Sequence, residues 1–243
     1  MKKIYRVADY ISDFLVEKKI KHTFLLPGGG NMYLVDGVGK NKKIEVVPCL
    51  HEQGVSIAAE AYSRIRENLG VGIITTGPGS TNAITGVAGA WIDSIPLLII
   101  SGQVKRDDIM KNNKVRQNGV QEVDIVSMIK NITKFSQTIR KKEDIKKILE
   151  KSFYLATSGR PGPVWIDIPL DIQGAPIEPT KLKGWNNKKY YKNLQIKKQK
   201  INKIFKMISM SKRPLILAGH GVRLSGKTDL FKKVINKLGI PVV

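Results

Sequence analysis

Short apolar runs alternate with segments of helical periodicity along most of the chain, and this pattern limits the fold more than any other feature of the sequence. The apolar runs have the length and composition of strands. Strands that are apolar throughout and separated by helices are typical of a parallel sheet that is covered on both faces. We therefore predict an α/β fold with a doubly wound, mostly parallel sheet and helices on both faces. The predicted strands are 22–26, 44–50, 71–76, 96–102, 133–135 and 163–169, and the predicted helices are 7–18, 32–38, 52–65, 81–91, 123–129 and 143–157.

The same pattern divides the chain into two domains. Residues 1–173 hold the alternation just described and form the first predicted domain. Residues 174–199, with Pro176, Pro179 and many Lys, have the composition of a linker. Residues 200–243 begin a second, Rossmann-like α/β domain, with too few elements to complete it. Its predicted elements are a helix at 201–210, a strand at 215–218, a helix at 227–238 and a strand from 240.

Positive charge is concentrated in the last quarter of the chain. The formal net charge is +22, but the part from Lys181 onward holds 17 Lys and Arg against one acid, Asp229, so the first 180 residues carry only +6. Such an excess is typical of a polyanion-binding protein. Here, however, the sequence lacks the aromatic, Arg and Gly motifs that read nucleic acid. We interpret the excess as a solvated surface or a biased composition, keep a polyanion site as the alternative, and expect no nucleic-acid partner.

The cysteine and hydropathy patterns indicate a cytoplasmic protein. Cys49 is the single cysteine, which excludes a disulfide framework and a cysteine metal cluster and favours a reducing compartment. The first residues run into Asp9 and Asp13 rather than an apolar core, unlike a secretion signal. No apolar run reaches the roughly 18 residues that span a bilayer, so we expect no membrane partner. None of the three histidines has a second ligand at metal-binding spacing, and we predict no metal site in these residues.

One carboxylate, Glu52, stands at the junction between the predicted strand 44–50 and the helix that follows it. An acid in a first helical turn complements the helix dipole, so helix stabilisation is the plainer interpretation of Glu52 alone. Ligands of parallel sheets, however, bind at the carboxyl ends of the strands. A carboxylate placed there can act on a buried heterocycle, which makes Glu52 a candidate catalytic residue.

Two glycine-containing loops lie at other strand ends. The first, Pro27-Gly28-Gly29-Gly30, would let the backbone approach a ligand closely, with a plain tight turn as the alternative. The second, 75–82, looks like a phosphate cradle but lacks the Lys and Ser or Thr of a P-loop and the G-x-G-x-x-G spacing. A neutral, flat ligand fits the second loop better. The residues that favour such a ligand are the apolar Pro78, the hydrogen-bonding Thr75 and Asn82, and the small Gly77 and Gly79.

Six motifs that occur in order along the chain give it a family resemblance. Together they resemble the pyrimidine-binding domain of thiamine diphosphate enzymes, closest to the acetolactate synthase large subunit group. The resemblance covers about residues 4–180, and the remainder resembles the start of that family's central domain. It implies the amino-terminal portion of an enzyme that decarboxylates and joins 2-keto acids. The motifs are His-Glu-Gln-Gly at 51–54, Thr-Thr-Gly-Pro-Gly-Ser-Thr-Asn-Ala at 75–83, Asp-Ser-Ile-Pro-Leu at 93–97, Ser-Gly-Gln-Val at 101–104, Gln-Glu-Val-Asp at 121–124 and Gly-Arg-Pro-Gly-Pro at 159–163.

The resemblance also implies roles for individual residues. The cofactor supplies the carbanion chemistry, and the protein supplies placement and proton handling. Glu52 matches the acid that contacts the ring nitrogen of the aminopyrimidine and favours the imino form, and Gln121 matches a position on the substrate side. We list both as catalytic. The residues that match cofactor-binding positions are Pro27, Gly28, Glu52, Thr75, Pro78 and Asn82.

Part of such an active site is expected to lie outside these residues. By resemblance, the diphosphate and its magnesium ion are held by another domain through a Gly-Asp-Gly motif and a later Asn. These 243 residues contain no Gly-Asp-Gly triplet, so we expect them to be inactive on their own. The resemblance further implies a homodimer or higher homo-oligomer with the active site between subunits. Small residues after Glu52 would let that helix approach another helix, and ordinary core packing explains them equally well. These residues are Ser56, Ala58, Ala59 and Ala61.

Three departures from the family pattern leave the substrate open. Val120 and Leu26 stand where an aromatic residue is usual, and Leu170 stands where a Lys is common. Another thiamine diphosphate decarboxylase or lyase is therefore an alternative, as is a noncatalytic binding or regulatory protein that lacks the diphosphate domain. The turn at 218–221 resembles the central-domain opening in which some relatives hold FAD. FAD is thus a second candidate cofactor, with a structural glycine turn as the plainer interpretation.

Overall fold

The computed structural model describes residues 4–110, 115–186 and 197–243. Its internal contacts divide the chain into two units, Met1–Asn186 and Asn187–Val243, which are described separately below. Of the predicted linker 174–199, residues 187–196 lie outside the described part of the chain.

The first unit is built around a six-stranded sheet in which every described strand pair is parallel, which confirms the predicted fold class. The strand order is β2-β1-β3-β4-β6-β5. Of the four inner strands, β3, β4 and β6 are buried along their whole length, as their apolar runs require. The strands are β1 (His22–Leu25), β2 (Glu45–Pro48), β3 (Gly70–Ile74), β4 (Leu97–Gln103), β5 (Phe135–Thr138) and β6 (Pro163–Pro169).

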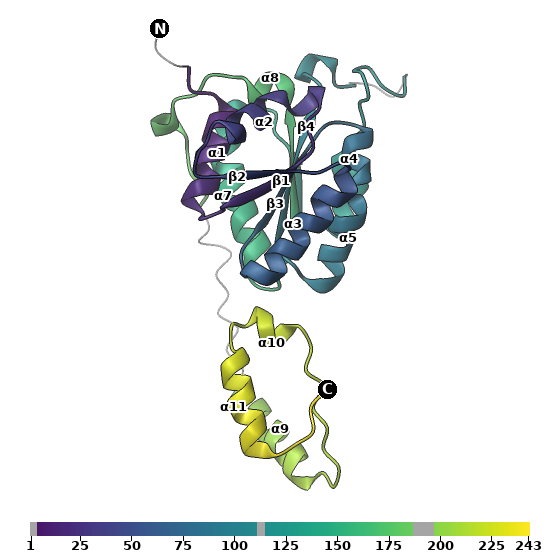
Figure 1. The fold of residues 1–243 in the computed structure, drawn as a ribbon, viewed down its shortest axis with the longest axis vertical. Coiled ribbons are helices and arrows are strands. Elements are labelled where there is room, and N and C mark those ends of the chain that lie inside the picture. Colours follow the sequence, from purple (N-terminus) through teal and green to yellow (C-terminus); the bar gives the residue numbers. More distant parts are fainter. Residues whose placement is uncertain (1–3, 111–114, 187–196) are drawn as a thin grey trace. The chain divides into compact units, whose positions relative to one another are not determined.

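Helices cover both faces of the sheet, as predicted (Figure 1). Within β4, Leu98 and Ile100 join the core cluster under α1, α2 and α7, whereas Leu97 and Ile99 join the cluster under α3, α5 and α6. This alternation is the two-residue period of a strand with both faces buried. The helices are α1 (Val7–Glu17), α2 (Met32–Gly39), α3 (Glu52–Arg66), α4 (Pro78–Asn82), α5 (Ile84–Asp93), α6 (Ile125–Ile129), α7 (Ile145–Thr157) and α8 (Leu170–Gln173). Short 3-10 helices occupy Gly29–Asn31, Arg106–Asp108, Lys130–Ile132, Lys142–Asp144 and Pro179–Lys181.

The helix predicted at 81–91 is two helices, and the first begins earlier than predicted. Gly77 precedes α4 with a φ of 61°, a left-handed conformation that glycine adopts at no steric cost. Pro78 then takes the first helical position, where its missing N–H is not needed. The helical conformation is interrupted at Ala83, and α5 begins at the next residue. The loop predicted at 75–82 is thus half helix.

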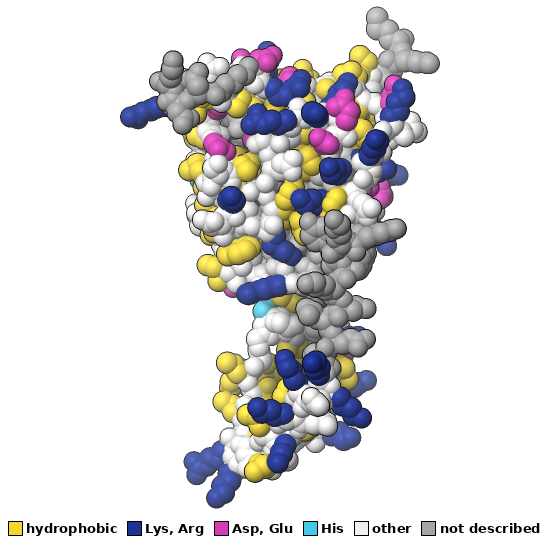
Figure 2. Space-filling model, turned by 180° about the vertical axis from the view of Figure 1, so that it is seen from behind, with side chains coloured by type: hydrophobic (Ala, Val, Ile, Leu, Met, Phe, Trp, Pro, Cys, Tyr) yellow, Lys and Arg dark blue, Asp and Glu magenta, His cyan; other side chains and the backbone are white. Residues whose placement is uncertain are grey.

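The second unit holds α9 (Lys198–Met210), α10 (Gly221–Leu224) and α11 (Thr228–Leu238). The predicted strands at 215–218 and from 240 are reduced to a single parallel bridge between Ile216 and Val242. No side chain within 197–243 is classed as buried, so the apolar faces of α9 and α11 are exposed. Figure 2 shows Lys and Arg spread over this unit, with Asp and Glu visible on the first unit. Within the described ranges, no helix is both long and apolar enough to cross a membrane.

Replacing a central strand residue should destabilise the first unit. Leu98 is 1% exposed in the middle of β4. We expect Leu98→Ala to lower the free energy of unfolding by about 2–5 kcal/mol, because the cavity adds to the lost apolar burial. Urea unfolding followed by tryptophan fluorescence reports on this unit alone, since Trp91, Trp165 and Trp185 all lie in it. Ile4→Ala, at an isoleucine that is 67% exposed, serves as the control, and an equal loss in both variants would contradict the assigned core.

Candidate active site

Three loops that carry the predicted site residues leave neighbouring strands at the same edge of the sheet. Strands β2, β1 and β3 are adjacent in the sheet and parallel. The segment to Glu52 follows β2, the Gly28 turn follows β1, and the Thr75 loop follows β3. Because all three strands run in one direction, their carboxyl ends bring these loops together.

Glu52 is the first residue of α3 and is only 7% exposed. His51 caps the helix, and its Nδ1 accepts a hydrogen bond from the backbone N–H of Gln53 at 3.1 Å. Asn82, at the end of α4, donates from Nδ2 to Glu52 Oε2 at 3.0 Å. The carboxylate is therefore held from the β3 side of the site, and the prediction that Glu52 and Asn82 share one site is consistent with this geometry.

Glycine residues allow the loops to approach one another within contact distance. A Cβ at position 79 would lie 3.0 Å from Glu52 Oε1 and 2.5 Å from Thr75 Cγ2. A Cβ at position 28 would lie 2.6 Å from the Thr75 side chain, and the Gly30 N–H donates to Thr75 Oγ1 at 3.1 Å. Glycine at 28 and 79 is thus required by the close approach of the backbone to Thr75.

The backbone of Gln121 packs against Gly77 at the same edge of the sheet. A side chain at position 77 would collide with the Gln121 carbonyl, so the segment around 121 lies directly on the loop that begins at Thr75. Gln121 itself has a φ of 59° and an exposed side chain. Pro27 and Pro78 are exposed beside these contacts, next in sequence to Gly28 and Gly79.

The charge of Glu52 limits what the 75–82 loop can bind. A phosphate cradled by this loop would meet the Glu52 carboxylate, whose Oε1 would lie only 3.0 Å from a Cβ at position 79. Two negative charges a few ångströms apart in a partly dry site repel strongly. The arrangement therefore favours a neutral or cationic group with hydrogen-bonding atoms, and the neutral, flat ligand expected from the sequence stays a prediction.

The sequence analysis missed a buried polar network beneath this edge. Asp167 in β6 is 1% exposed and accepts hydrogen bonds from Ser101 Oγ at 2.7 Å, Gln103 Nε2 at 3.1 Å and Thr138 Oγ1 at 3.2 Å. Trp165 Nε1 donates to Ser101 Oγ at 2.8 Å. The sequence feature that could have predicted this network is the single acid, Asp167, inside an otherwise apolar strand. A carboxylate is seldom buried without hydrogen-bonding partners.

Two further buried amides that the sequence analysis missed hold the first glycine turn. Asn31 is fully buried, donates from Nδ2 to the Leu26 carbonyl at 3.0 Å and accepts from the Gly28 N–H at 2.8 Å. Gln173, at the end of α8, donates from Nε2 to the Gly30 carbonyl at 2.7 Å. The turn after β1 is therefore fixed from two sides before any ligand binds.

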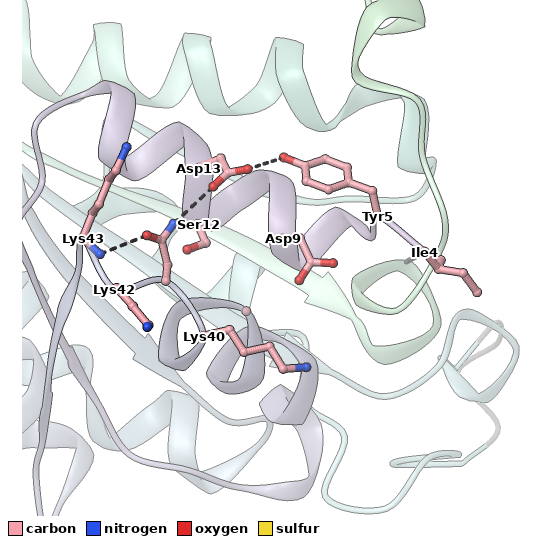
Figure 3. A pocket seen from close by; sticks show the side chains of 10 residues that line it. Ile4, Tyr5, Asp9, Ser12, Asp13, Lys40, Lys42 and Lys43 are labelled. Atoms are coloured by element: carbon pink, nitrogen blue, oxygen red, sulfur yellow. Dashed lines mark hydrogen bonds between the residues drawn. The ribbon is translucent and has the colours of Figure 1, made fainter. Parts of the chain in front are cut away.

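A separate cleft of about 440 Å³ lies between α1 and the segment 40–43 (Figure 3). Its acids already have partners: Asp13 accepts from Tyr5 Oη at 2.7 Å and from Asn41 Nδ2 at 3.1 Å, and Asp9 pairs with Arg6. None of the predicted site residues lines it. Among the residues that the structure describes, no three His, Cys, Asp or Glu side chains gather as a metal group.

Comparison with known proteins gives two family matches that follow one another along the chain. Residues 5–128 match the thiamine pyrophosphate enzyme N-terminal TPP binding domain, and residues 201–243 match the thiamine pyrophosphate enzyme central domain. Glu52, its partner Asn82 and Gln121 all lie within the first match.

Among curated proteins, the chain is similar to acetolactate synthases. It is 36% identical to the acetolactate synthase large subunit of Lactococcus lactis subsp. lactis (strain IL1403) over 229 residues, which cover 94% of this chain and 39% of that protein. It is 35% identical to the chloroplastic acetolactate synthase of Arabidopsis thaliana over 237 residues, covering 97% and 34%. It is 32% identical to the isozyme 3 large subunit of Escherichia coli (strain K12), covering 97% and 40%. The chain thus spans 34–40% of the length of these relatives.

The buried Asp167 should make the folded protein less stable as the pH rises from about 4 to about 6, the opposite of the effect of most acids. Burial raises the pKa of its carboxyl to about 6, although hydrogen bonds from Ser101, Gln103 and Thr138 oppose the increase. An unfolded Asp titrates near about 3.9, so the folded state binds more protons between the two values. The stabilisation from protonated Asp167 is full below pH 4 and is lost as the pH rises through about 6.

We expect Asp167→Asn to remove this pH dependence. Between pH 4 and 7 the unfolding free energy of the wild type should fall relative to the variant, by an amount on the order of 2–3 kcal/mol. Urea unfolding at several pH values measures it, since the wild-type minus variant difference cancels the other acids. A constant difference over this range would show that Asp167 does not titrate there.

Proposed function

We propose, because the chain belongs to the thiamine pyrophosphate enzyme family, that the whole protein is an acetolactate synthase-like enzyme acting on 2-keto acids. The names of the similar proteins support this assignment over another decarboxylase or lyase and over a noncatalytic binding protein. The observation that carries it for this chain is Glu52, a buried carboxylate held by Asn82 at the edge of the sheet.

The residues at this edge fit the aminopyrimidine end of thiamine diphosphate. Glu52 offers a carboxylate to a ring nitrogen, and Thr75 and Asn82 place further hydrogen-bonding groups near it, with Gly28 packed against the Thr75 side chain. When bound, the cofactor supplies a thiazolium carbon that becomes nucleophilic after losing its proton. We assign Glu52 Oε1 to the ring nitrogen, since Oε2 already accepts a hydrogen bond from Asn82.

Burial gives Glu52 its function in this proposal. A carboxylate that is 7% exposed exchanges its proton with the ligand more readily than with bulk water, because little solvent reaches it. Gln121 lies at the exposed margin of the same edge, and we assign it to the substrate. Pro27 and Pro78 complete the apolar border of the pyrimidine pocket.

The rest of the active site is assigned to other parts of the protein. The diphosphate and magnesium would be held by a Gly-Asp-Gly motif, which these 243 residues lack, so we expect them to be inactive alone. FAD binding at 218–221 and a cytoplasmic location stay predictions. This proposal assigns no ligand to the Lys and Arg residues of the second unit, which are interpreted as solvated.

A second copy of the protein is the partner we propose for the outer face of α3. In the described structure Ser56 and Ala59 are core residues, whereas Ala61 is exposed and Ala58 is half-buried. An exposed stripe of small and apolar residues therefore follows the helix that Glu52 begins and continues onto α5. Figure 1 shows that α5 lies next to α3. Small residues permit close approach of a second helix. The stripe consists of Gly54, Ile57, Ala58, Ala61 and Ile65 on α3, and Trp91 and Ile92 on α5.

Glu52→Gln tests the proposed chemistry in the full-length protein. The amide can still accept from Asn82 but cannot hold the proton, so we expect the rate of thiamine C2 hydrogen–deuterium exchange to fall roughly 100- to 10,000-fold. Glu60→Gln is the matched control, because Glu60 is a buried acid on the same helix that pairs with Arg64. Normal C2 exchange in Glu52→Gln would exclude the assigned role.

Ile57→Lys tests the proposed partner. Ile57 is 46% exposed at the centre of the α3 stripe, and a buried lysine there would be costly. We expect the dimer dissociation constant to rise roughly tenfold or more, measured by analytical ultracentrifugation. Ile4→Lys, at an exposed isoleucine outside the stripe, should leave self-association unchanged. Equal behaviour of both variants would place the contact elsewhere.

A further inference from the structure

Gln103, the last residue of β4, has a side chain whose hydrogen-bonding atoms are all engaged. It is 5% exposed. Its Nε2 donates to Asp167 Oδ2 and to the Val123 carbonyl, both at 3.1 Å. Its Oε1 accepts from Thr76 Oγ1 and from the Val104 N–H, both at 2.9 Å. Turning the amide over would set its NH2 group against the Val104 N–H and its oxygen against the Val123 carbonyl and the Asp167 carboxylate, so only one orientation satisfies the site.

The partners of Gln103 belong to two separate parts of the candidate active site. Thr76 lies in the 75–82 loop that ends with Asn82, the residue that holds Glu52. Val123 lies two residues after Gln121. These two segments also touch directly, because the Gln121 carbonyl occupies the space that a side chain at Gly77 would need. Gln103 therefore bridges the two segments from below.

Asp167 fixes the bridge in place. Its carboxylate also accepts from Ser101 Oγ and Thr138 Oγ1, so it is tied to β4 and to β5. A buried carboxylate leaves the interior only at high cost, which makes it a rigid anchor for the amide. The second Nε2 hydrogen is then directed to the Val123 carbonyl.

We propose that Gln103 is a positioning residue that clamps segment 119–123, and with it Gln121, onto the 75–82 loop. The inference rests on the proposed function for the meaning of Gln121, but the clamp itself is a property of this chain. We expect the Glu52–Asn82 hydrogen bond to persist when the clamp is lost, because neither side chain bonds to Gln103, and the loss should therefore act on the substrate side of the site.

Hydrogen–deuterium exchange of the full-length protein without cofactor tests the clamp directly. Gln103→Met keeps the volume and removes the amide, and should speed exchange about tenfold in peptides that cover 75–82 and 117–123. Gln173→Met is the matched control: it removes another buried amide, which donates to Gly30, and should affect 26–31 while leaving 117–123 unchanged. The same exchange pattern in both variants would overturn the proposal.

A milder variant covers the case in which Gln103→Met folds poorly. Thr76→Val removes one hydroxyl from the clamp and nearly keeps the shape of the side chain. It should speed exchange at 117–123, and should add nothing when combined with Gln103→Met, because the two share one interaction. Additive effects, or exchange that is unchanged at 117–123, would show that Thr76 and Gln103 do not act together.

Kinetics separates positioning from general stability. Gln103→Met and Thr76→Val should raise KM for the 2-keto acid about tenfold while kcat changes less than about threefold. Leu98→Ala, which only destabilises the core, should lower the active fraction and hence apparent kcat with KM unchanged. If Gln103→Met behaves like Leu98→Ala, Gln103 is merely structural.

The proposed function and the clamp can fail separately. If the wild type does not bind thiamine diphosphate, the proposed function fails, and the hydrogen–deuterium exchange experiment still tests the clamp.

Discussion

The hydrogen bonds to one buried carboxylate determine how the candidate active site is held. Asp167 sits in the interior of β6, where an unpartnered acid would cost several kcal/mol. Donors on β4 and β5 offset part of that cost, and they tie the carboxyl ends of three neighbouring strands at one point. Gln103 extends this anchor to the candidate site, because its amide also bonds to Thr76 in the 75–82 loop and to the Val123 carbonyl beside Gln121.

The shape of the candidate site depends on glycine residues as much as on the side chains that line it. At Gly28, Gly77 and Gly79 a Cβ would collide with Thr75 or Gln121, and so the loops can converge only with glycine there. Their convergence removes solvent from Glu52 without placing a cation beside it in the described residues, and Asn82 provides a neutral donor instead. A carboxylate held by an amide keeps an oxygen free for a ligand, whereas a bound Arg or Lys would have occupied it.

The sequence predicted the fold well because the central strands are apolar runs that only a double-covered parallel sheet can bury. It predicted Glu52 because one acid stood at a strand end. It missed Asp167, whose partner Ser101 is 66 residues away, since the pairing appears only once β4 and β6 are neighbours. It overstated the strands near Ile216 and Val242, because an apolar run becomes a strand only when neighbouring strands pair with it. The early start of α4 followed from a positive φ at Gly77, which helical periodicity does not report.

The three departures from the family pattern do not carry equal weight for the substrate. Leu26 packs against the core cluster beneath α3 and α5, so an aromatic residue lost there is a change of packing. Leu170 is half-buried at the start of α8 and precedes Asp171, which pairs with Arg106 at 2.6 Å. Val120 is 81% exposed and adjoins Gln121. Of the three positions, Val120 is therefore the one that is both exposed and next to the residue that the proposal assigns to the substrate.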